Sequence, residues 1–239
     1  MGRLVVLLNH HFIVSLYLWF DVYSAYHTSM HIVSVIAQKG GTGKTTLAIS
    51  LAVAGHLAGR TVAIIDLDPQ ATASNWSDRR HDHEHPAVVS AQPARLPHVL
   101  QAAHAAGTHL VIIDTPPRAE HAALSAARAA TLVLIPCRPA VFDLDTVATT
   151  LDLLKLSPTA SIAAVLNAVP AAGDERTQAT TILRELGLSV CPTALGLRKA
   201  YAQSAETGKS AQEFAPTGKA ADEIRAVYRF VNRLLKETV

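Results

Sequence analysis

The residues best suited to chemistry form a short loop rich in glycine and lysine. Residues 38–46 read Gln-Lys-Gly-Gly-Thr-Gly-Lys-Thr-Thr and lie between an apolar run, 31–37, and a run with helical spacing, 47–57. Glycine lets backbone N–H groups turn inward without a Cβ clash, and a following helix adds the positive end of its dipole. A glycine-rich loop between a strand and a helix is typical of a phosphate-binding site. In such a loop Lys44 reaches the outer phosphates and the Thr45 hydroxyl ligates Mg²⁺.

Two further apolar runs end in carboxylates. Residues 61–65 lead into Asp66-Leu-Asp68, and residues 110–113 lead into Asp114. Near-continuous apolar strands are typical of a parallel sheet that is covered on both faces, and such sheets bind ligands at the carboxyl ends of their strands. We therefore expect the three strand ends to meet at one place, with the carboxylates beside the glycine-rich loop.

Strands and helices are expected to alternate along the chain. The expected strands are 31–37, 61–67, 88–90, 110–113, 131–135, 161–166 and 188–190. The expected helices are 44–58, 96–106, 119–129, 143–156, 175–186 and 217–236, with the segment 197–206 before the last. This alternation predicts an α/β fold, a doubly wound, mostly parallel sheet flanked by helices. Length and composition fit one domain, residues 30–239, preceded by an extension, residues 1–29.

The loop departs from the common phosphate-loop sequence G-x-x-x-x-G-K-[ST], because Gln38 occupies the position of the first glycine and Lys39 follows it. The form K-G-G-x-G-K-T-T resembles the deviant Walker A box of the ParA/MinD ATPases. The box Asp-Leu-Asp-Pro-Gln at 66–70 resembles the second signature of that family, and the resemblance covers about residues 31–238. Three further stretches resemble the small, plasmid-type members close to ParF: Asn75-Trp76-Ser77, residues 134–139 followed by Asp143, and residues 197–235.

The resemblance implies a P-loop NTPase fold with ATP and Mg²⁺ as cofactors. The nucleotide would contact the whole loop: Lys39, Gly40, Gly41, Thr42, Gly43, Lys44, Thr45 and Thr46. Lys39 would reach across a nucleotide-sandwich homodimer, and Asp68 would position the attacking water. The expected catalytic residues are Lys39, Lys44 and Asp68, and the expected metal site is formed by Thr45, Asp66 and a Walker B aspartate, Asp114.

The implied activity is slow, partner-stimulated hydrolysis of ATP to ADP and phosphate. It would drive plasmid or chromosome partition through an ATP-bound homodimer, non-specific DNA and a ParB-like adaptor protein, in the cytoplasm and on the nucleoid. No membrane association is expected, since residues 230–239 resemble the end of a folded helix and not the membrane helix of MinD. Two alternatives stay open: a MinD-like or cargo-positioning ATPase that acts on a membrane or a protein cluster, and a biosynthetic P-loop enzyme of the same fold group.

Basic residues in the C-terminal half have two interpretations. Arg225, Arg229, Arg233 and Lys236 recur at helical spacing and share one face. They form either an ordinary solvated helix face or, as the resemblance implies, a contact with the phosphate backbone of DNA. The candidate DNA contacts are Arg198, Lys199, Arg225 and Arg229. No helix-turn-helix segment precedes the glycine-rich loop, and operator-specific binding is therefore not expected.

The remaining features point to no second function. The net charge of +2 gives no global field toward nucleic acid or membrane, and Cys137 and Cys191 are expected to be buried, reduced thiols of a cytosolic protein. Residues 81–85, His-Asp-His-Glu-His, are either a solvated loop or a strand whose alternate histidines bind Zn²⁺. The apolar stretches of residues 1–29 are too interrupted to span a membrane. That extension is an upstream segment without a defined role, such as a misplaced start, or a membrane-touching segment, or a packed or dimerising helix.

Overall fold

The computed structural model describes residues 30–80, 85–156 and 160–237. Its centre is a sheet of seven strands in the order β3-β2-β4-β1-β5-β6-β7, in which every neighbouring pair is parallel. The strands are β1 (His31–Val35), β2 (Val62–Asp66), β3 (Ala87–Ser90), β4 (Leu110–Asp114), β5 (Leu132–Cys137), β6 (Ser161–Leu166) and β7 (Ser189–Val190). Every residue of β2, β4 and β5 is buried, as near-continuous apolar runs predict.

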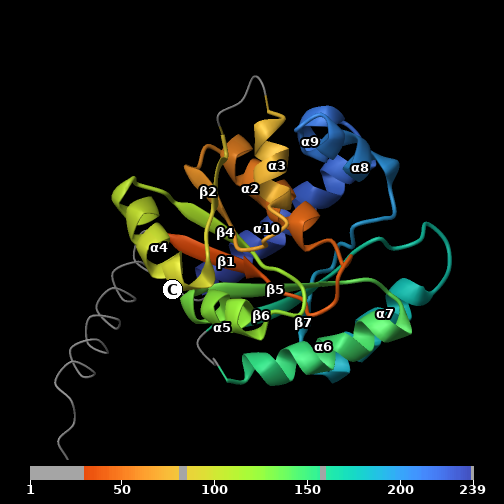
Figure 1. Ribbon diagram of the computed structural model, residues 1–239. Helices are drawn as coiled ribbons and strands as arrows, with labels where there is room; N and C mark the ends of the chain where they lie inside the picture. The colour runs from red at the N-terminus through yellow and green to blue at the C-terminus, as the bar shows by residue number, and fades with distance from the viewer. Residues whose placement is uncertain (1–29, 81–84, 157–159, 238–239) are drawn as a thin grey trace, which may run out of the picture.

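Helices cover both faces of this sheet (Figure 1). They are α2 (Lys44–Leu57), α3 (Thr72–Asp78), α4 (Leu96–Ala105), α5 (Glu120–Ala129), α6 (Val141–Leu154), α7 (Glu175–Glu185), α8 (Lys199–Glu206), α9 (Ala211–Phe214) and α10 (Lys219–Glu237), with a 3₁₀ turn at Pro93–Arg95 before α4. The expected doubly wound α/β fold is confirmed.

The core is divided into two layers by the sheet, because successive side chains of a strand point to opposite faces. Ile112 of β4 packs in the cluster that contains the buried residues of α2, α3 and α10. Its neighbour Ile113 packs in the cluster that contains those of α4, α5, α6 and α7. Burying a side chain of this size contributes about 1.5–3 kcal/mol, and both layers therefore stabilise the sheet.

Two helices were missing from the sequence-based expectation. Helix α3 falls in a polar segment for which neither a helix nor a strand was predicted, and its first turn is stabilised by a side chain outside the helix. The Asp66 carboxylate, at the end of β2, accepts hydrogen bonds from the backbone N–H groups of Ala73 and Ser74 at 3.0 and 3.2 Å. It thus satisfies first-turn donors of α3 that no residue next to the helix reaches. The short α9 begins at Ala211, and its N-cap Ser210 forms a capping box with Glu213.

Both cysteines are free thiols in the buried interior, as expected. The zinc hypothesis falls mainly on residues 81–84, which lie outside the described residues, as does the whole extension 1–29. Within the described ranges no three His, Cys, Asp or Glu side chains are grouped so as to hold a metal ion. Met30 is 1% exposed and packs in the core at the start of β1.

Candidate nucleotide-binding site

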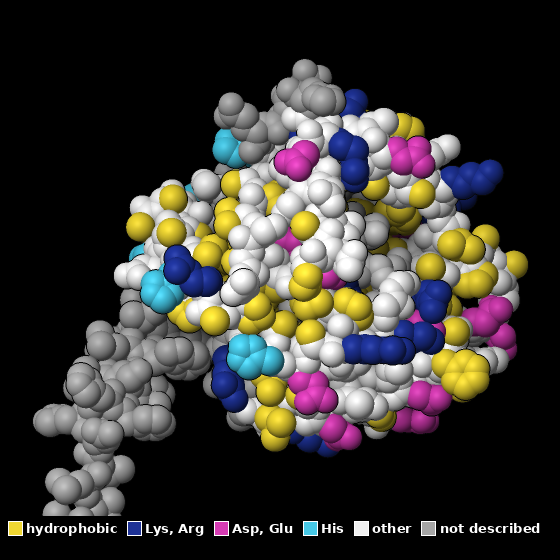
Figure 2. Space-filling model, viewed as in Figure 1, with side chains coloured by type: hydrophobic (Ala, Val, Ile, Leu, Met, Phe, Trp, Pro, Cys, Tyr) yellow, Lys and Arg dark blue, Asp and Glu magenta, His cyan; other side chains and the backbone are white. Residues whose placement is uncertain are grey.

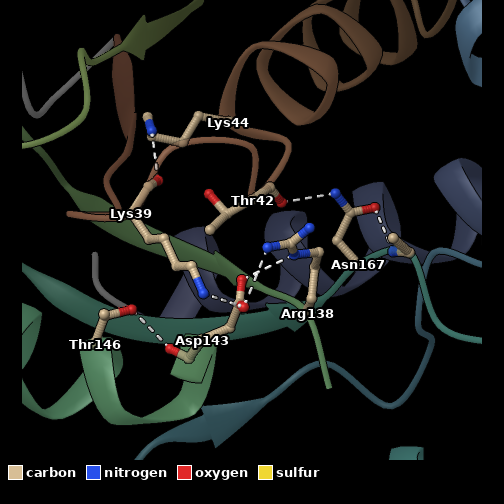
Figure 3. A network of polar contacts seen from close by, with 8 residues as sticks. Lys39, Thr42, Lys44, Arg138, Asp143, Thr146 and Asn167 are labelled. Carbon is tan, nitrogen blue, oxygen red and sulfur yellow. Dashed lines mark hydrogen bonds and ion pairs between the residues drawn. The ribbon is translucent and has the colours of Figure 1, made fainter. Parts of the chain in front are cut away.

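The glycine-rich loop joins the carboxyl end of β1 to the first turn of α2, as predicted. Gly41 and Gly43 have φ angles of +74° and +91°, which residues with a Cβ rarely adopt. A Cβ on Gly43 would lie 1.9 Å from Nδ2 of Asn167. That amide nitrogen donates a hydrogen bond to the Thr42 carbonyl at 2.7 Å (Figure 3). Asn167 therefore fixes the loop from the carboxyl end of β6, a role that sequence reasoning missed although its place directly after a strand was the available signal.

Lys44 is folded back into the loop. Its Nζ atom donates to the backbone carbonyl of Lys39 at 3.2 Å, and only 7% of the residue is exposed. Burial lowers the pKa of Lys44, and the negative charges of Asp114 and Asp68 oppose that shift only in part. The structure thus brings Lys44 close to carboxylates that follow two other strands, β4 and β2. An anion bound in the loop would stabilise the charged ammonium group of Lys44.

Asp114 lies at the end of β4 and is completely buried. Neither of its carboxylate oxygens has a hydrogen-bond partner. Burial raises the pKa of Asp114 to about 7, an effect that the nearby Thr45 hydroxyl and Lys44 ammonium offset only in part. A buried carboxylate without donors is costly unless a cation joins it. Oxygen atoms of Asp114 and the adjacent Thr45 are the hard ligands that Mg²⁺ prefers, and these residues therefore fit a magnesium site.

Asp66 and Asp68 have different environments, although they stand two residues apart. Both oxygens of Asp66 already accept hydrogen bonds, Oδ1 from the Asp68 N–H at 3.0 Å and Oδ2 from the first turn of α3. Asp68 is partly exposed, and its Oδ1 accepts from the Gln70 N–H at 2.9 Å. Asp66 therefore supports the site in two ways: it binds the first turn of α3, and its negative charge lies near Asp114. Asp68, in contrast, remains accessible to a ligand or a water molecule.

Lys39 lies at the loop entrance and contacts its own chain. Its Nζ atom is 2.6 Å from Oδ2 of Asp143, at the start of α6, and Arg138 Nε is 2.9 Å from the other oxygen (Figure 3). Burial alone would raise the pKa of Asp143, but the hydrogen bonds from Arg138 and Lys39 outweigh it and lower that pKa. The Lys39 side chain is 28% exposed. A competing anion can therefore replace Asp143 as the partner of the Lys39 ammonium group.

The surface next to this ion-pair cluster is apolar. Val141 and Phe142, which directly precede Asp143, are 71% and 76% exposed. Figure 2 shows Lys and Arg side chains beside exposed hydrophobic side chains over the N-terminal end of α6. Large apolar groups at this exposure are typical of a surface that another molecule covers.

Helix α3 links the Asp66–Asp68 segment to the C-terminal part of the chain. Arg80, just after α3, is buried and binds the Glu213 carboxylate with two nitrogens, at 2.7 and 3.0 Å. It also donates to the carbonyl of Gly208 and lies over the ring of Trp76. The Trp76 indole in turn donates to the Lys209 carbonyl at 3.1 Å. These contacts join α3 and the residue that follows it to the segment between α8 and α9.

The candidate DNA contacts lie at the start of α8 and on α10, and they are not equivalent. Arg198 forms an ion pair with Glu223, and Arg225 pairs with Asp222. Lys199 and Arg229 are exposed. Two of the four charges are therefore partly neutralised within the chain, which sequence spacing could not show.

Comparison with known proteins agrees with this geometry. A family model described as "CobQ/CobB/MinD/ParA nucleotide binding domain" matches residues 33–211. Maintenance of carboxysome distribution protein A of Gloeobacter kilaueensis is 34% identical over 205 residues, which are 84% of this chain and 91% of the relative. Chromosome-partitioning ATPase Soj of Thermus thermophilus is 28% identical and aligns with 86% of this chain and 96% of its own length.

The fold recurs in a solved structure. The septum site-determining protein MinD from Pyrococcus horikoshii, complexed with Mg-ADP, superposes with a TM-score of 0.68 over 88% of this chain and 99% of that one, at 18% identity. Within the described residues, no helix is long and apolar enough to cross a membrane.

The phosphate loop, the three converging strand ends and the family match over most of the chain agree, and the protein belongs to the CobQ/CobB/MinD/ParA family of nucleotide-binding domains.

Proposed function

We propose that this protein is a Mg-ATP-dependent, dimerising ATPase that binds DNA without sequence preference and positions a cargo in the cytoplasm, on the nucleoid. The observation that carries the proposal is the buried Asp114 carboxylate, whose oxygens have no hydrogen-bond partner and which lies near Thr45 and Lys44 of the phosphate loop. The buried Asp114 carboxylate and Lys44 ammonium group are costly in the absence of a ligand. Both are stabilised when a cation and a polyphosphate bind together.

The residues of the chain have separable roles in hydrolysis. The loop N–H groups and Lys44 bind the outer phosphates, and Thr45 and Asp114 hold Mg²⁺, with Asp66 as a supporting charge. Mg²⁺ supplies positive charge beside the transferring phosphoryl group when it is bound. Asp68 orients the attacking water, because its carboxylate is accessible where that of Asp66 is not.

Lys39 gives the dimer its dependence on ATP. In the single chain Asp143, which also pairs with Arg138, holds Lys39 at the loop entrance, next to the exposed apolar pair Val141 and Phe142. A second subunit that covers this surface would present a triphosphate, whose charge competes with Asp143 for the ammonium group. Hydrolysis removes the γ-phosphate and so weakens that contact, which makes the dimer an ATP-timed switch.

Turnover is the direct test of the chemical roles. Asp68→Ala should retain Mg-ATP in a stable dimer and lose at least about 100-fold in hydrolysis rate, the loss that follows from removing a water-orienting group. Asp152→Ala is the matched control, because Asp152 is an exposed carboxylate on α6 that forms an ion pair with Lys155. Equal turnover in Asp68→Ala and the parent would refute the assigned role.

DNA binding is tested by gel shift with unrelated duplexes, in ATP, in ADP and without nucleotide. Binding should need Mg-ATP and weaken steeply with salt, because phosphate contacts release counterions. Neutralising the two exposed residues, Lys199→Gln with Arg229→Gln, should weaken binding to every duplex alike and flatten the salt slope. Lys155→Gln, an exposed lysine directly after α6, is the control. The absence of any ATP-dependent shift at low salt would contradict the DNA role.

Two cargoes are supported by specific observations. A plasmid or chromosome, carried with a ParB-like adaptor, fits the similarity to Soj, whose name includes chromosome partitioning. A large protein assembly fits the carboxysome-distribution relative, which is more similar at 34% identity. A neighbouring reading frame for a small DNA-binding protein would favour the first. Co-purification of the Asp68→Ala dimer with a protein assembly would favour the second.

A further inference from the structure

The turn after β4 contains an arginine with a strained backbone. Arg118 follows Asp114 in the segment that leads to α5, and its φ angle is +53°, in the left-handed region that favours glycine. Within the described residues the other non-glycine residues with a positive φ are two alanines, Ala71 and Ala168. Backbone strain of this kind persists where the surrounding structure holds it, and it is common at functional sites. A long cationic side chain at this position therefore calls for an explanation.

Two hydrogen bonds hold this turn against the phosphate loop. The Thr115 hydroxyl donates to the carbonyl of Val35, at the end of β1, at 2.8 Å. The backbone N–H of Arg118 donates to the carbonyl of Gln38, where the loop begins, at 3.1 Å. The two residues between these donors are prolines, whose rings fix their φ angles. The backbone of Arg118 is therefore held at the loop entrance.

Arg118 and Lys44 contact neighbouring peptide groups of the loop. Lys44 Nζ donates to the carbonyl of Lys39, the residue that directly follows Gln38 (Figure 3). Arg118 binds the preceding carbonyl through its backbone, so that its side chain begins close to the Lys44 ammonium group. In the proposed function that ammonium group and the loop N–H groups bind the outer phosphates of ATP. The side chain of Arg118 thus begins beside the site of the γ-phosphate.

The Arg118 guanidinium group is free to bind a ligand. The residue is exposed, and among the described residues its side chain has no hydrogen-bond or ion-pair partner. The neighbouring cations are engaged, since Lys39 and Arg138 both pair with Asp143. A guanidinium group donates to phosphate oxygens in a fork geometry that matches their spacing. Arg118 therefore offers an accessible anion-binding group next to the phosphate loop.

We infer that Arg118 binds the γ-phosphate of the ATP held by its own subunit. This inference rests on the proposed function and adds to it a residue that distinguishes ATP from ADP, because ADP lacks the phosphate that the guanidinium group contacts. The nucleotide of the same subunit is the target, since both hydrogen bonds of the turn are made to β1 and the loop of the same chain. A guanidinium group at the γ-phosphate also stabilises the charge of the transferring phosphoryl group.

The experiment measures the nucleotide affinities of the full-length protein by isothermal titration calorimetry. With Mg²⁺ and a non-hydrolysable ATP analogue, Arg118→Gln should bind about tenfold or more weakly than the parent, the contribution of a charge-assisted hydrogen bond. Mg-ADP should bind equally well to both proteins. Arg118→Lys, which keeps the charge without the fork, should recover part of the lost affinity. Arg128→Gln, which changes an exposed arginine on α5, is the control and should bind both nucleotides as the parent does.

A glycine variant separates this role from a structural one. Arg118→Gly removes the guanidinium group and relieves the strain of the positive φ. It should be at least as stable as the parent in urea unfolding, yet bind the ATP analogue as weakly as Arg118→Gln. The loss should persist when Lys39→Ala is added to prevent the ATP-bound dimer. A loss confined to the dimer would place the guanidinium group on the partner subunit's nucleotide and overturn the inference.

The outcomes also separate this inference from the proposed function. If the parent binds and hydrolyses Mg-ATP, and Arg118→Gln keeps the parent's relative affinity for the ATP analogue and ADP, the inference alone is wrong. Equal weakening of both nucleotides also overturns it, because that result would indicate a damaged loop. If the parent binds neither nucleotide, the proposed function and the inference fail together.

Discussion

The buried Asp114 carboxylate should make the nucleotide-free protein less stable as the pH rises. Its pKa is 3.8 in an unfolded chain and about 7 in the folded protein, because burial disfavours the charged form. Between these values the folded protein holds a proton on Asp114 that the unfolded chain has released. The free energy of unfolding therefore falls as the pH rises through this window, and Asp114 contributes no further change above it. From pH 5 to pH 8 the loss is roughly 2–3 kcal/mol, at 1.36 kcal/mol for each unit of difference.

Replacing Asp114 by Asn should remove this dependence, since asparagine resembles the protonated carboxyl in size and polarity. Asp143 and Glu213, whose pKa values are lowered, titrate in more acidic solution and equally in both proteins. The measurement is urea unfolding of parent and Asp114→Asn at pH 5, 6, 7 and 8, without Mg²⁺ or nucleotide. The variant should be the more stable protein at pH 8 and should fail to hydrolyse ATP. Parallel pH curves for the two proteins would refute the reasoning.

Four other changes have defined outcomes. Lys39→Ala should spare most nucleotide binding and abolish the ATP-bound dimer, as light scattering would measure. Gly43→Ala should lower stability by about 1–3 kcal/mol and abolish ATP binding in a fluorescent-nucleotide assay, since the loop needs a positive φ and has no space for a Cβ. Arg80→Gln should cost about 3–5 kcal/mol in urea unfolding, because it leaves the Glu213 carboxylate without its buried partner. A chain that begins at Met30 should fold and hydrolyse ATP as the full chain does, and a large loss would show that residues 1–29 contribute to the domain.

Matched variants separate these effects from general damage. Lys155→Ala removes an exposed lysine and should leave the ATP-bound dimer intact. Gly59→Ala also forces a positive φ, of +80°, but into open space, so it should cost stability and spare ATP binding. Arg79→Gln, beside Arg80 and on the surface, should change stability by no more than about 0.5 kcal/mol. If a control matches its partner variant, the corresponding assignment is wrong.

The sequence alone determined the phosphate loop and the architecture around it. The spacing of Lys39, Gly43 and Lys44 after an apolar run predicted the loop, since few backbones other than a phosphate cradle require that pattern. The alternation of apolar runs and helical patterns predicted the sheet, because both signals are local and repeat along the chain. Parallel strands that share one carboxyl edge then placed Asp66, Asp68 and Asp114 near the loop.

Only the tertiary structure decided what each of these side chains contacts. Asp66 and Asp68 look equivalent in sequence, yet one caps α3 and the other is accessible, because the first turn of α3 folds onto the end of β2. Asn167 stands 124 positions after Gly43, and no local pattern connects them. Contacts between distant segments depend on how helices pack on the sheet, and a pattern read along one segment carries no information about that packing.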